Sequence, residues 1–168
     1  MRLVVNAGHT KLGVGTGAVG LLTESVETRK IAYELMKQLT DTNIEVIPAV
    51  FDKSTNNLKQ AVNLSNDNFA DMFISIHLNA GGGHGTEIYT WKGVRKPIAV
   101  KILDNMLALG FTNRGVKDGS GLYVIKNTKC EALLIEVCFV DSEEDNRLFK
   151  QVGYEKIATT IANAIKSI

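Results

Sequence analysis

Residues 132–140 read ALLIEVCFV. Every residue in this stretch except Glu136 is apolar, so both sides of an extended chain would carry apolar side chains. Strands of this kind lie in sheets that are covered on both faces, as in α/β proteins. The stretch therefore predicts a mostly parallel or mixed sheet with helices on both faces.

Apolar and β-branched runs of strand length recur along the chain, and segments with helical spacing separate them. The predicted strands are Leu3–Asn6, Ile44–Phe51, Met72–His77, Thr86–Trp91, Leu122–Lys126 and Ala132–Val140. The predicted helices are Glu24–Leu39 with Thr23 as N-cap, Leu58–Asn66, Pro97–Leu109, a short one after Ser142, and a terminal one with Ile157, Ile161, Ile165 and Ile168 on one face. We expect one α/β domain with about six strands.

The composition excludes several classes of partner. The chain has 168 residues, with 19 basic and 18 acidic side chains and a net charge of +1, so it offers no basic surface to nucleic acid. No apolar run approaches the roughly 18 residues of a membrane span, and the first run is too short for a signal peptide. We expect synthesis in the cytoplasm without a signal peptide, no membrane insertion, and free thiols at Cys130 and Cys138.

Polar residues stand where several predicted strands end. His9 follows the first strand, and His77 and Asn79 come at the end of the third. In open α/β sheets, ligands bind outside the carboxyl ends of the strands. One such histidine is more often structural, but two histidines with nearby carboxylates resemble a catalytic zinc site, in which three protein ligands leave a position for water.

Two glutamates are candidates to complete this site. A charge in a strand buried on both faces, as at Glu136, costs several kcal/mol unless it is paired or lies beside a cation. No basic residue lies between Lys129 and Arg147, so a local ion pair is the weaker explanation, and a general base is the stronger one. Glu24, in the first turn of a helix, is explained by the helix dipole alone.

The motifs together resemble a known family. In order they are VVNAGH (residues 4–9), TESVE (23–27), ADMFISIHLNA (70–80), GTEIY (85–89), NRGVK (113–117), LYVI (122–125) and ALLIEVCFV (132–140). This series is similar to the zinc-dependent N-acetylmuramoyl-L-alanine amidases of the type-3 amidase family. Those enzymes cleave the amide between N-acetylmuramic acid and the first L-alanine of the peptidoglycan stem. The resemblance runs from about Leu3 to the terminal helix.

The resemblance implies a role for each of four residues. His9, Glu24 and His77 match the ligands of one zinc ion per chain, and Glu136 matches the catalytic glutamate that activates water. The dipole explanation of Glu24 is thereby replaced. Asn6 stands where the family often has an aspartate near a ligand histidine, which leaves the partner of His9 open.

Two further residues match family positions near the substrate, Asn79 and Glu87. Alternative explanations are a turn residue before Gly81–Gly83 for Asn79, and an exposed position on an edge strand for Glu87. His84 has no matching ligand and is expected to be an exposed loop residue. The glycines are expected to leave their loop free to move beside the substrate.

The resemblance implies a catalytic domain over residues 1–168 that acts on peptidoglycan as a monomer, with a wall-binding domain absent from the chain. A phage endolysin that reaches the wall at lysis fits best, followed by a mother-cell autolysin. The alternatives are a zinc peptidase cutting within the stem peptide and a non-catalytic wall-binding module on the same fold. A cysteine hydrolase is a weaker alternative, because Cys138 should share a face with Glu136 and be a core residue.

Overall fold

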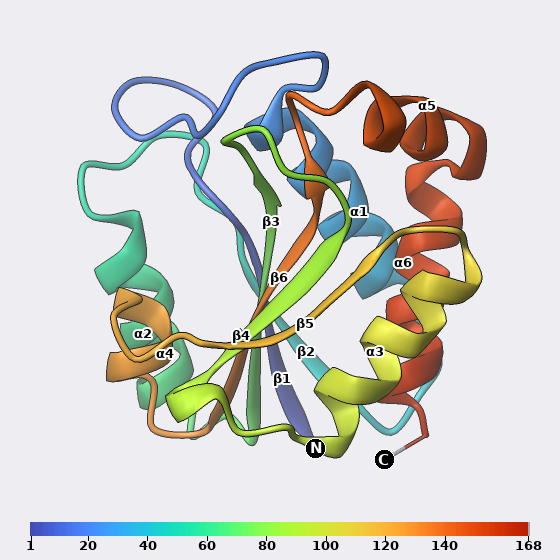
Figure 1. The fold of residues 1–168 in the computed structure, drawn as a ribbon. Helices are drawn as coiled ribbons and strands as arrows, with labels where there is room; N and C mark the ends of the chain where they lie inside the picture. The colour runs from blue at the N-terminus through green and yellow to red at the C-terminus, as the bar shows by residue number, and fades with distance from the viewer. Residues whose placement is uncertain (168) are drawn as a thin grey trace.

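Six strands form one mixed sheet in the order β2-β1-β3-β6-β4-β5 in the computed structural model, which describes residues 1–167 (Figure 1). The strands are β1 (Arg2–Ala7), β2 (Glu45–Ala49), β3 (Met72–Asn79), β4 (Thr86–Thr90), β5 (Asn113–Asp118) and β6 (Glu131–Phe139). β2, β1, β3 and β6 are parallel, whereas β4 runs antiparallel to β6 and parallel to β5. The predicted α/β class and mixed sheet are confirmed.

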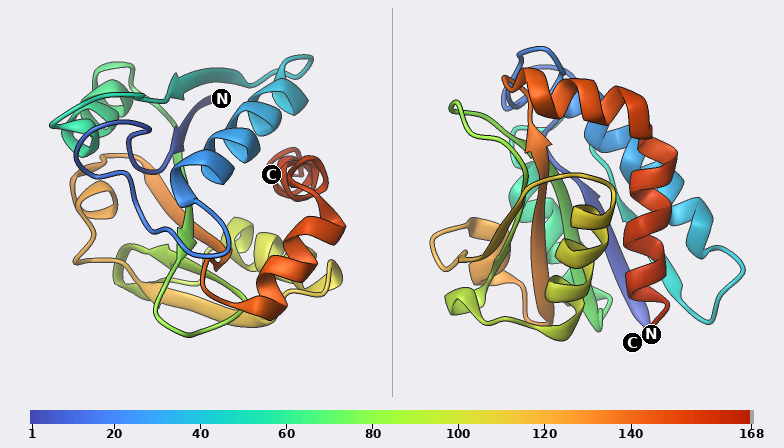
Figure 2. Two further views of the ribbon diagram at one scale, coloured as in Figure 1. Left: turned by 90° about the horizontal axis from the view of Figure 1, so that it is seen from above. Right: turned by 45° about the vertical axis from the view of Figure 1, so that its right-hand side comes forward.

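Helices cover both faces of this sheet, as the views in Figures 1 and 2 show. They are α1 (Glu24–Leu39), α2 (Asn57–Asp67), α3 (Pro97–Ala108), α4 (Tyr123–Asn127), α5 (Glu143–Val152) and α6 (Tyr154–Ile165), with a 3₁₀ turn, η1 (Trp91–Gly93). α1, α3 and α6 enclose the larger apolar core on one face, and α2 and α4 enclose a smaller one on the other.

The burial of β6 explains its composition. Leu133 and Ile135 lie in the larger core, and Leu134 lies in the smaller core on the opposite face. Each such side chain contributes about 1.5–3 kcal/mol when it leaves water. A strand with water on one face would alternate polar and apolar residues, so the apolar residues on both faces of β6 place it inside the sheet.

One predicted strand is wrong and one strand was missed. Residues 122–126 do not form a strand, because Tyr123–Asn127 is the short helix α4, which buries Val124 and Ile125 in the smaller core. Apolar runs this short are compatible with either structure. The missed strand is β5, which has the sequence NRGVKD and no fully buried residue. As an edge strand it lacks the apolar pattern by which strands are recognised.

The helix predictions are confirmed within a residue or two. Thr23 occupies the N-cap of α1, although its side chain makes no capping hydrogen bond. Ser142 does cap α5, where its side chain accepts a hydrogen bond from the Asp145 amide. Ile157, Ile161 and Ile165 are buried together in the larger core, and Ile168 lies outside the described residues.

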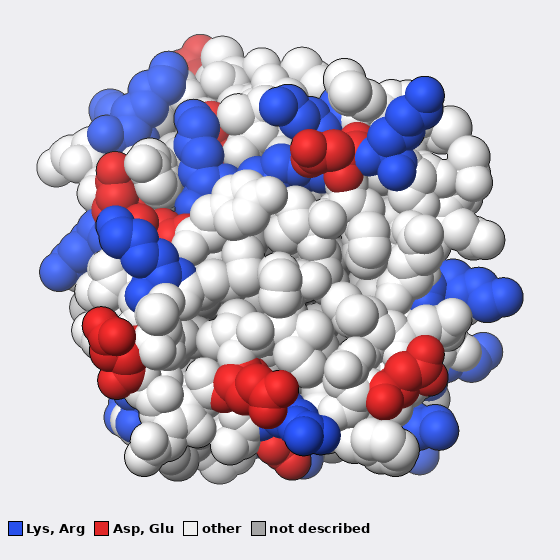
Figure 3. Space-filling view, turned by 180° about the vertical axis from the view of Figure 1, so that it is seen from behind, with Lys and Arg blue, Asp and Glu red and all other residues white. Residues whose placement is uncertain are grey.

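The surface matches the near-neutral composition. On the side opposite to that of Figure 1, charged side chains of both signs surround an uncharged central area (Figure 3). Among the described residues, no helix has the length and apolar character needed to cross a bilayer.

Candidate metal centre

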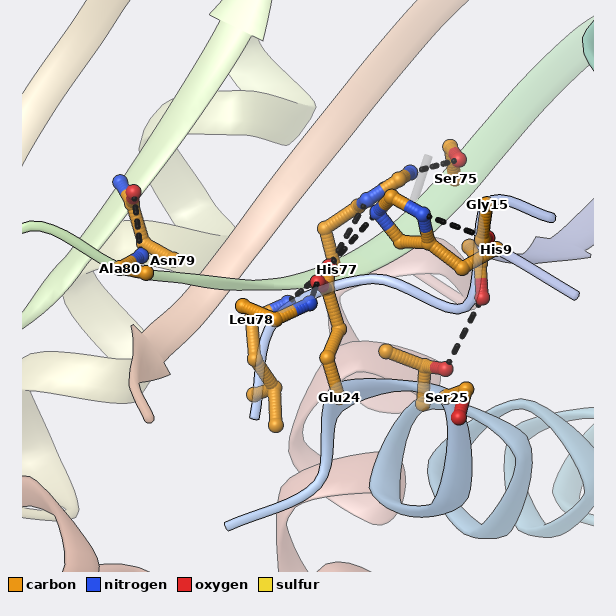
Figure 4. Close-up of polar contacts among 12 residues, drawn as sticks. His9, Gly15, Glu24, Ser25, Ser75, His77, Leu78, Asn79 and Ala80 are labelled. Atoms are coloured by element: carbon orange, nitrogen blue, oxygen red, sulfur yellow. Dashed lines mark hydrogen bonds and ion pairs between the residues drawn. The ribbon is translucent and has the colours of Figure 1, made fainter. Parts of the chain in front are cut away.

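Three side chains from separate segments converge at the carboxyl edge of the parallel strands. His9 lies just beyond β1, Glu24 opens α1, and His77 lies near the end of β3, the neighbour of β1. Figure 4 shows the Glu24 side chain reaching from α1 to the two imidazole rings. One potential ligand atom from each residue lies within 4.8 Å of the others, close enough to hold a metal ion.

The carboxylate of Glu24 links the two histidines. Its Oε1 atom is 3.1 Å from His77 Nδ1 and 3.2 Å from His9 Nε2. The backbone N–H groups of Ala18 and Leu78 donate to Oε2 and Oε1 at 2.8 and 3.1 Å. With the side chain of Glu24 only 4% exposed, these contacts fix the carboxylate.

The opposite nitrogen of each histidine also has a partner. His9 Nδ1 is 3.1 Å from the carbonyl oxygen of Gly15, and His77 Nε2 is 2.9 Å from Ser75 Oγ. Ser75 in turn donates to Asn6 Oδ1 at 2.7 Å. Such partners set the tautomer and orientation of a ligand histidine. Asn6 therefore supports His77 through Ser75, whereas a backbone carbonyl supports His9.

The backbone around the site leaves room for these rings. A Cβ atom at Gly8 would lie 2.5 Å from the His77 ring, and one at Gly17, where φ is +79°, would lie 2.6 Å from Glu24 Oε2. His9 itself has a φ of 64°, a region that a residue with a side chain rarely adopts. Strain of this kind persists where the surroundings require it, and it often marks a functional position.

The electrostatics suit a divalent cation. Burial alone would raise the pKa of Glu24, but hydrogen bonds from His77 and His9 hold it well below its usual range. Burial lowers the pKa of His77 more than Glu24 raises it, and the hydrogen bond to Glu24 raises the pKa of His9. An anionic carboxylate and a neutral, buried imidazole are the forms that bind metal. Two histidines and one glutamate are a standard set for catalytic zinc.

Glu136 lies beside this cluster in the sheet. It is in register with His77 on β3 and with Glu87 on β4, so the three side chains share one face. Burial and the negative charges of Glu24 and Glu87 raise the pKa of Glu136 to about 8. Among residues 1–167, Glu136 forms no ion pair, and its buried Oε2 atom has no hydrogen-bond partner.

Asn79 and Glu87 contact each other and stand apart from the cluster. Asn79 Nδ2 donates to Glu87 Oε1 at 2.8 Å, and Asn79 Oδ1 accepts from the Ala80 amide at 2.8 Å, away from the histidines (Figure 4). Glu87 is 3% exposed on an interior strand, so its interpretation as an exposed residue on an edge strand is wrong. Its carboxylate also accepts hydrogen bonds from Tyr89 and Arg114, which the sequence reasoning did not single out, although both lie in the motifs GTEIY and NRGVK.

Hydrogen bonds hold the loop of Gly81–Gly83 in place. Asp141 Oδ2 accepts hydrogen bonds from the amides of Gly81 and Gly82, each at 2.9 Å, and joins the loop to the end of β6. The expectation of a loop free to move is therefore not supported. His84 is exposed, as predicted.

Neither cysteine is suited to act as a nucleophile. A bulge shifts the register of β6 between Glu136 and Phe139, and Cys138 packs in the larger core with Ile135 rather than on the face of Glu136. The expected shared face is thus wrong, although Cys138 is a core residue as predicted. Burial raises the pKa of both thiols, including Cys130, which opposes formation of a nucleophilic thiolate.

Comparisons with known proteins agree with this geometry. The family model described as N-acetylmuramoyl-L-alanine amidase matches residues 3–167. The chain is 31% identical to the N-acetylmuramoyl-L-alanine amidase CwlM of Bacillus licheniformis, over 98% of this chain and 67% of that protein. It is 35% identical to the uncharacterized protein CPE1502 of Clostridium perfringens, over 98% of this chain. The chain spans about half the length of that relative, at 51%.

Solved structures show the same fold. The catalytic domain of the CD27L endolysin targeting Clostridia difficile superposes with a TM-score of 0.88 at 28% identity, over 99% of this chain and 97% of that one. The catalytic domain of CwlV, an N-acetylmuramoyl-L-alanine amidase from Bacillus (Paenibacillus) polymyxa var. colistinus, gives 0.86 at 28% identity, over 99% and 96%.

Proposed function

The chain belongs to the N-acetylmuramoyl-L-alanine amidase family, and on this basis we propose that it hydrolyses the amide between N-acetylmuramic acid and the L-alanine of the peptidoglycan stem. The observation that carries the proposal is the cluster of His9, Glu24 and His77 with an unpaired, half-buried Glu136 in register beside it. We propose that the chain acts on the cell wall, as an endolysin or autolysin does, and as a monomer. Residues 1–168 would form its catalytic domain.

We propose that His9 Nε2, His77 Nδ1 and the Glu24 carboxylate hold one zinc ion. The support is the donor set, the convergence of the three atoms within 4.8 Å, and the partners that orient both rings from behind. Zinc bound there would lower the pKa of a bound water towards about 7 and would polarise the carbonyl of the scissile amide.

Glu136 would transfer the proton. Its carboxylate accepts a proton as the oxygen of the attacking water bonds to the lactyl carbonyl carbon, and it then delivers that proton to the departing nitrogen of L-alanine. The raised pKa favours the second step, because a carboxylic acid is available near neutral pH. The charge of Glu24 contributes to the raised pKa of Glu136. A dication that neutralises this charge would lower the pKa of Glu136 and favour the step in which its carboxylate accepts a proton.

Asn79 is proposed to contact the substrate near the reacting amide. Glu87 would act on the substrate only through its neighbours, because Asn79, Tyr89 and Arg114 already donate hydrogen bonds to its carboxylate.

The test is digestion of purified peptidoglycan by the parent chain and by Glu136→Gln. We expect new amino ends of L-alanine from the parent and a loss of at least a hundredfold in rate for the variant, in line with the usual contribution of general acid–base catalysis. The matched control is Glu131→Gln at the other end of β6, which should retain the parental rate.

Other outcomes identify the alternatives. New D-amino or diaminopimelate ends would indicate a peptidase that cuts within the stem. Wall binding without release of ends, unchanged by chelator, would indicate a binding module. Full activity in Glu136→Gln would refute the role of that residue.

A further inference from the structure

A second polar cluster lies on the same face of the sheet as Glu136, further along the row of strands. Its centre is Glu87, whose Oε1 accepts hydrogen bonds from Asn79 Nδ2 and Tyr89 Oη, both at 2.8 Å. Its Oε2 accepts one from Arg114 Nε at 2.8 Å. A buried carboxylate with three donors has little capacity left for a ligand. Glu87 is therefore a positioning residue that holds three donors in place, and Arg114 among them is partly exposed.

Arg114 is held rigidly yet remains accessible. Besides the bond to Glu87, its Nη1 donates to the His84 carbonyl oxygen at 3.4 Å, and its guanidinium lies 4.8 Å from the centre of the Phe139 ring. Within residues 1–167, Nη2 has no acceptor, and the side chain is 33% exposed. A fixed guanidinium with free N–H donors is a receptor for a carboxylate, which it can bind through two parallel hydrogen bonds.

The sheet sets the distance from this receptor to Glu136, beside the candidate metal centre. His77, Glu136 and Glu87 are paired across β3, β6 and β4, and Arg114 lies opposite Glu87 on β5, between the paired positions Asn113 and Val116. With strands about 4.8 Å apart, the Cα atom of Arg114 is roughly 10 Å from that of Glu136. An extended peptide covers about 3.3–3.6 Å per residue, so a group about two residues from the scissile amide comes within reach of the arginine.

The charges of the substrate indicate which part lies there. Once the lactyl carboxyl group of muramic acid is in the amide, the glycan has no carboxylate, and the remaining carboxylates are on the peptide side. We propose that Arg114 binds the α-carboxylate of the D-glutamyl residue that follows L-alanine, and that the stem peptide crosses β6 and β4 towards β5. This inference rests on the proposed function.

The test measures binding separately from cleavage. Two muramyl tripeptides are compared, MurNAc-L-Ala-γ-D-Glu-L-lysine amide and its counterpart with D-isoglutamine, in which only the α-carboxylate is replaced by a carboxamide. Dissociation constants are measured calorimetrically on two zinc-loaded proteins, the single variant Glu136→Gln and the double variant that also carries Arg114→Gln. We expect the carboxylate ligand to bind about tenfold to a hundredfold more tightly, as for a charge-assisted hydrogen bond, and the preference to vanish in Arg114→Gln.

The carboxamide ligand controls for any structural damage, because its affinity should change less than about threefold in Arg114→Gln. Arg114→Lys retains the charge without the planar fork and should keep part of the preference. Arg95→Gln, between β4 and α3, should change nothing. Equal affinities for the two ligands, a preference that survives Arg114→Gln, or no binding of either ligand would overturn the inference. Failure of the parent chain to cleave peptidoglycan would instead refute the proposed function.

Discussion

Glu136 should destabilise the metal-free protein at neutral pH, so Glu136→Gln should change stability in a pH-dependent way. The folded state raises the pKa of this carboxyl from 4.5 to about 8, because of burial and the charges of Glu24 and Glu87. Between these values the folded protein binds more protons at this site than the unfolded chain does, so the free energy of unfolding falls as the pH rises. Glutamine carries no charge at any of these pH values and removes this dependence.

The size of the effect follows from the pKa. At about 1.36 kcal/mol for each step of one in pKa, the rise to about 8 has a ceiling of about 5 kcal/mol. The unfolded carboxyl is already mostly ionised at pH 5, so at most about 3.5 kcal/mol of this falls between pH 5 and pH 8. Because Glu136 is only partly shielded from water, we expect on the order of 2–3 kcal/mol. Urea unfolding of chelator-treated protein measures the effect. The free energy of unfolding of Glu136→Gln minus that of the parent is determined at each pH, and the value at pH 5 is subtracted from the value at pH 8.

The free-energy cost of placing the glutamine amide in the site is equal at both pH values, so it cancels in this comparison. The matched control is Glu131→Gln, which breaks a partly exposed ion pair with Lys96 and should change stability by less than about 1 kcal/mol at either pH. A difference for Glu136→Gln that stays constant within about 0.5 kcal/mol from pH 5 to pH 8 would refute the reasoning, because linkage requires it to grow.

Three further substitutions test the supports of the site. Gly8→Ala would place a Cβ atom 2.5 Å from the His77 ring. We therefore expect its zinc affinity, measured by chelator competition, to fall at least about tenfold. The control is Gly121→Ala, which has open space around the new Cβ atom and should bind zinc with the parental affinity. Ser75→Ala removes the partner of His77 Nε2 and should weaken zinc binding by about 10–100-fold; an unchanged affinity would show that Ser75 does not orient the ring. Asp145→Asn replaces a buried carboxylate that accepts hydrogen bonds from the amides of Gly85 and Phe139. The free energy of unfolding, measured in urea, should fall by roughly 1–3 kcal/mol. It should fall less for Asp141→Asn, because the hydrogen bonds of Asp141 are exposed.

The parts of the fold that the sequence predicted are those that local pattern determines. The all-apolar stretch around Leu134 requires burial on both faces, and the spacing of Ile31 and Leu35 requires a helix with one buried side. The strand β5 escaped prediction because an edge strand needs no apolar pattern, and residues 122–126 were misassigned because a buried single turn of helix has the composition of a strand.

The site was predictable to a different degree at each residue. Glu136 was apparent from the residues alone, because a lone charge in an apolar strand has few structural explanations. Glu24 was not, since the helix dipole favours a glutamate at that position regardless of function. The burial of Glu87 depends on β4 lying between β6 and β5, which is a pairing of segments distant in sequence that no local pattern encodes.

The arrangement of carboxylates explains why the proton-transfer role falls to Glu136. Glu24 on one side contacts two histidines, whose hydrogen bonds hold its pKa below the usual range. Glu87 on the other side accepts hydrogen bonds from a guanidinium and from two neutral donors. Glu136 lies between them without a cation of its own, and their charges favour its neutral form. Environments that push neighbouring carboxyl groups apart in pKa assign separate roles to them. A pKa of about 8 suits Glu136 to accept and release a proton near neutral pH, while Glu24 contacts the two histidines and Glu87 holds Arg114 in place.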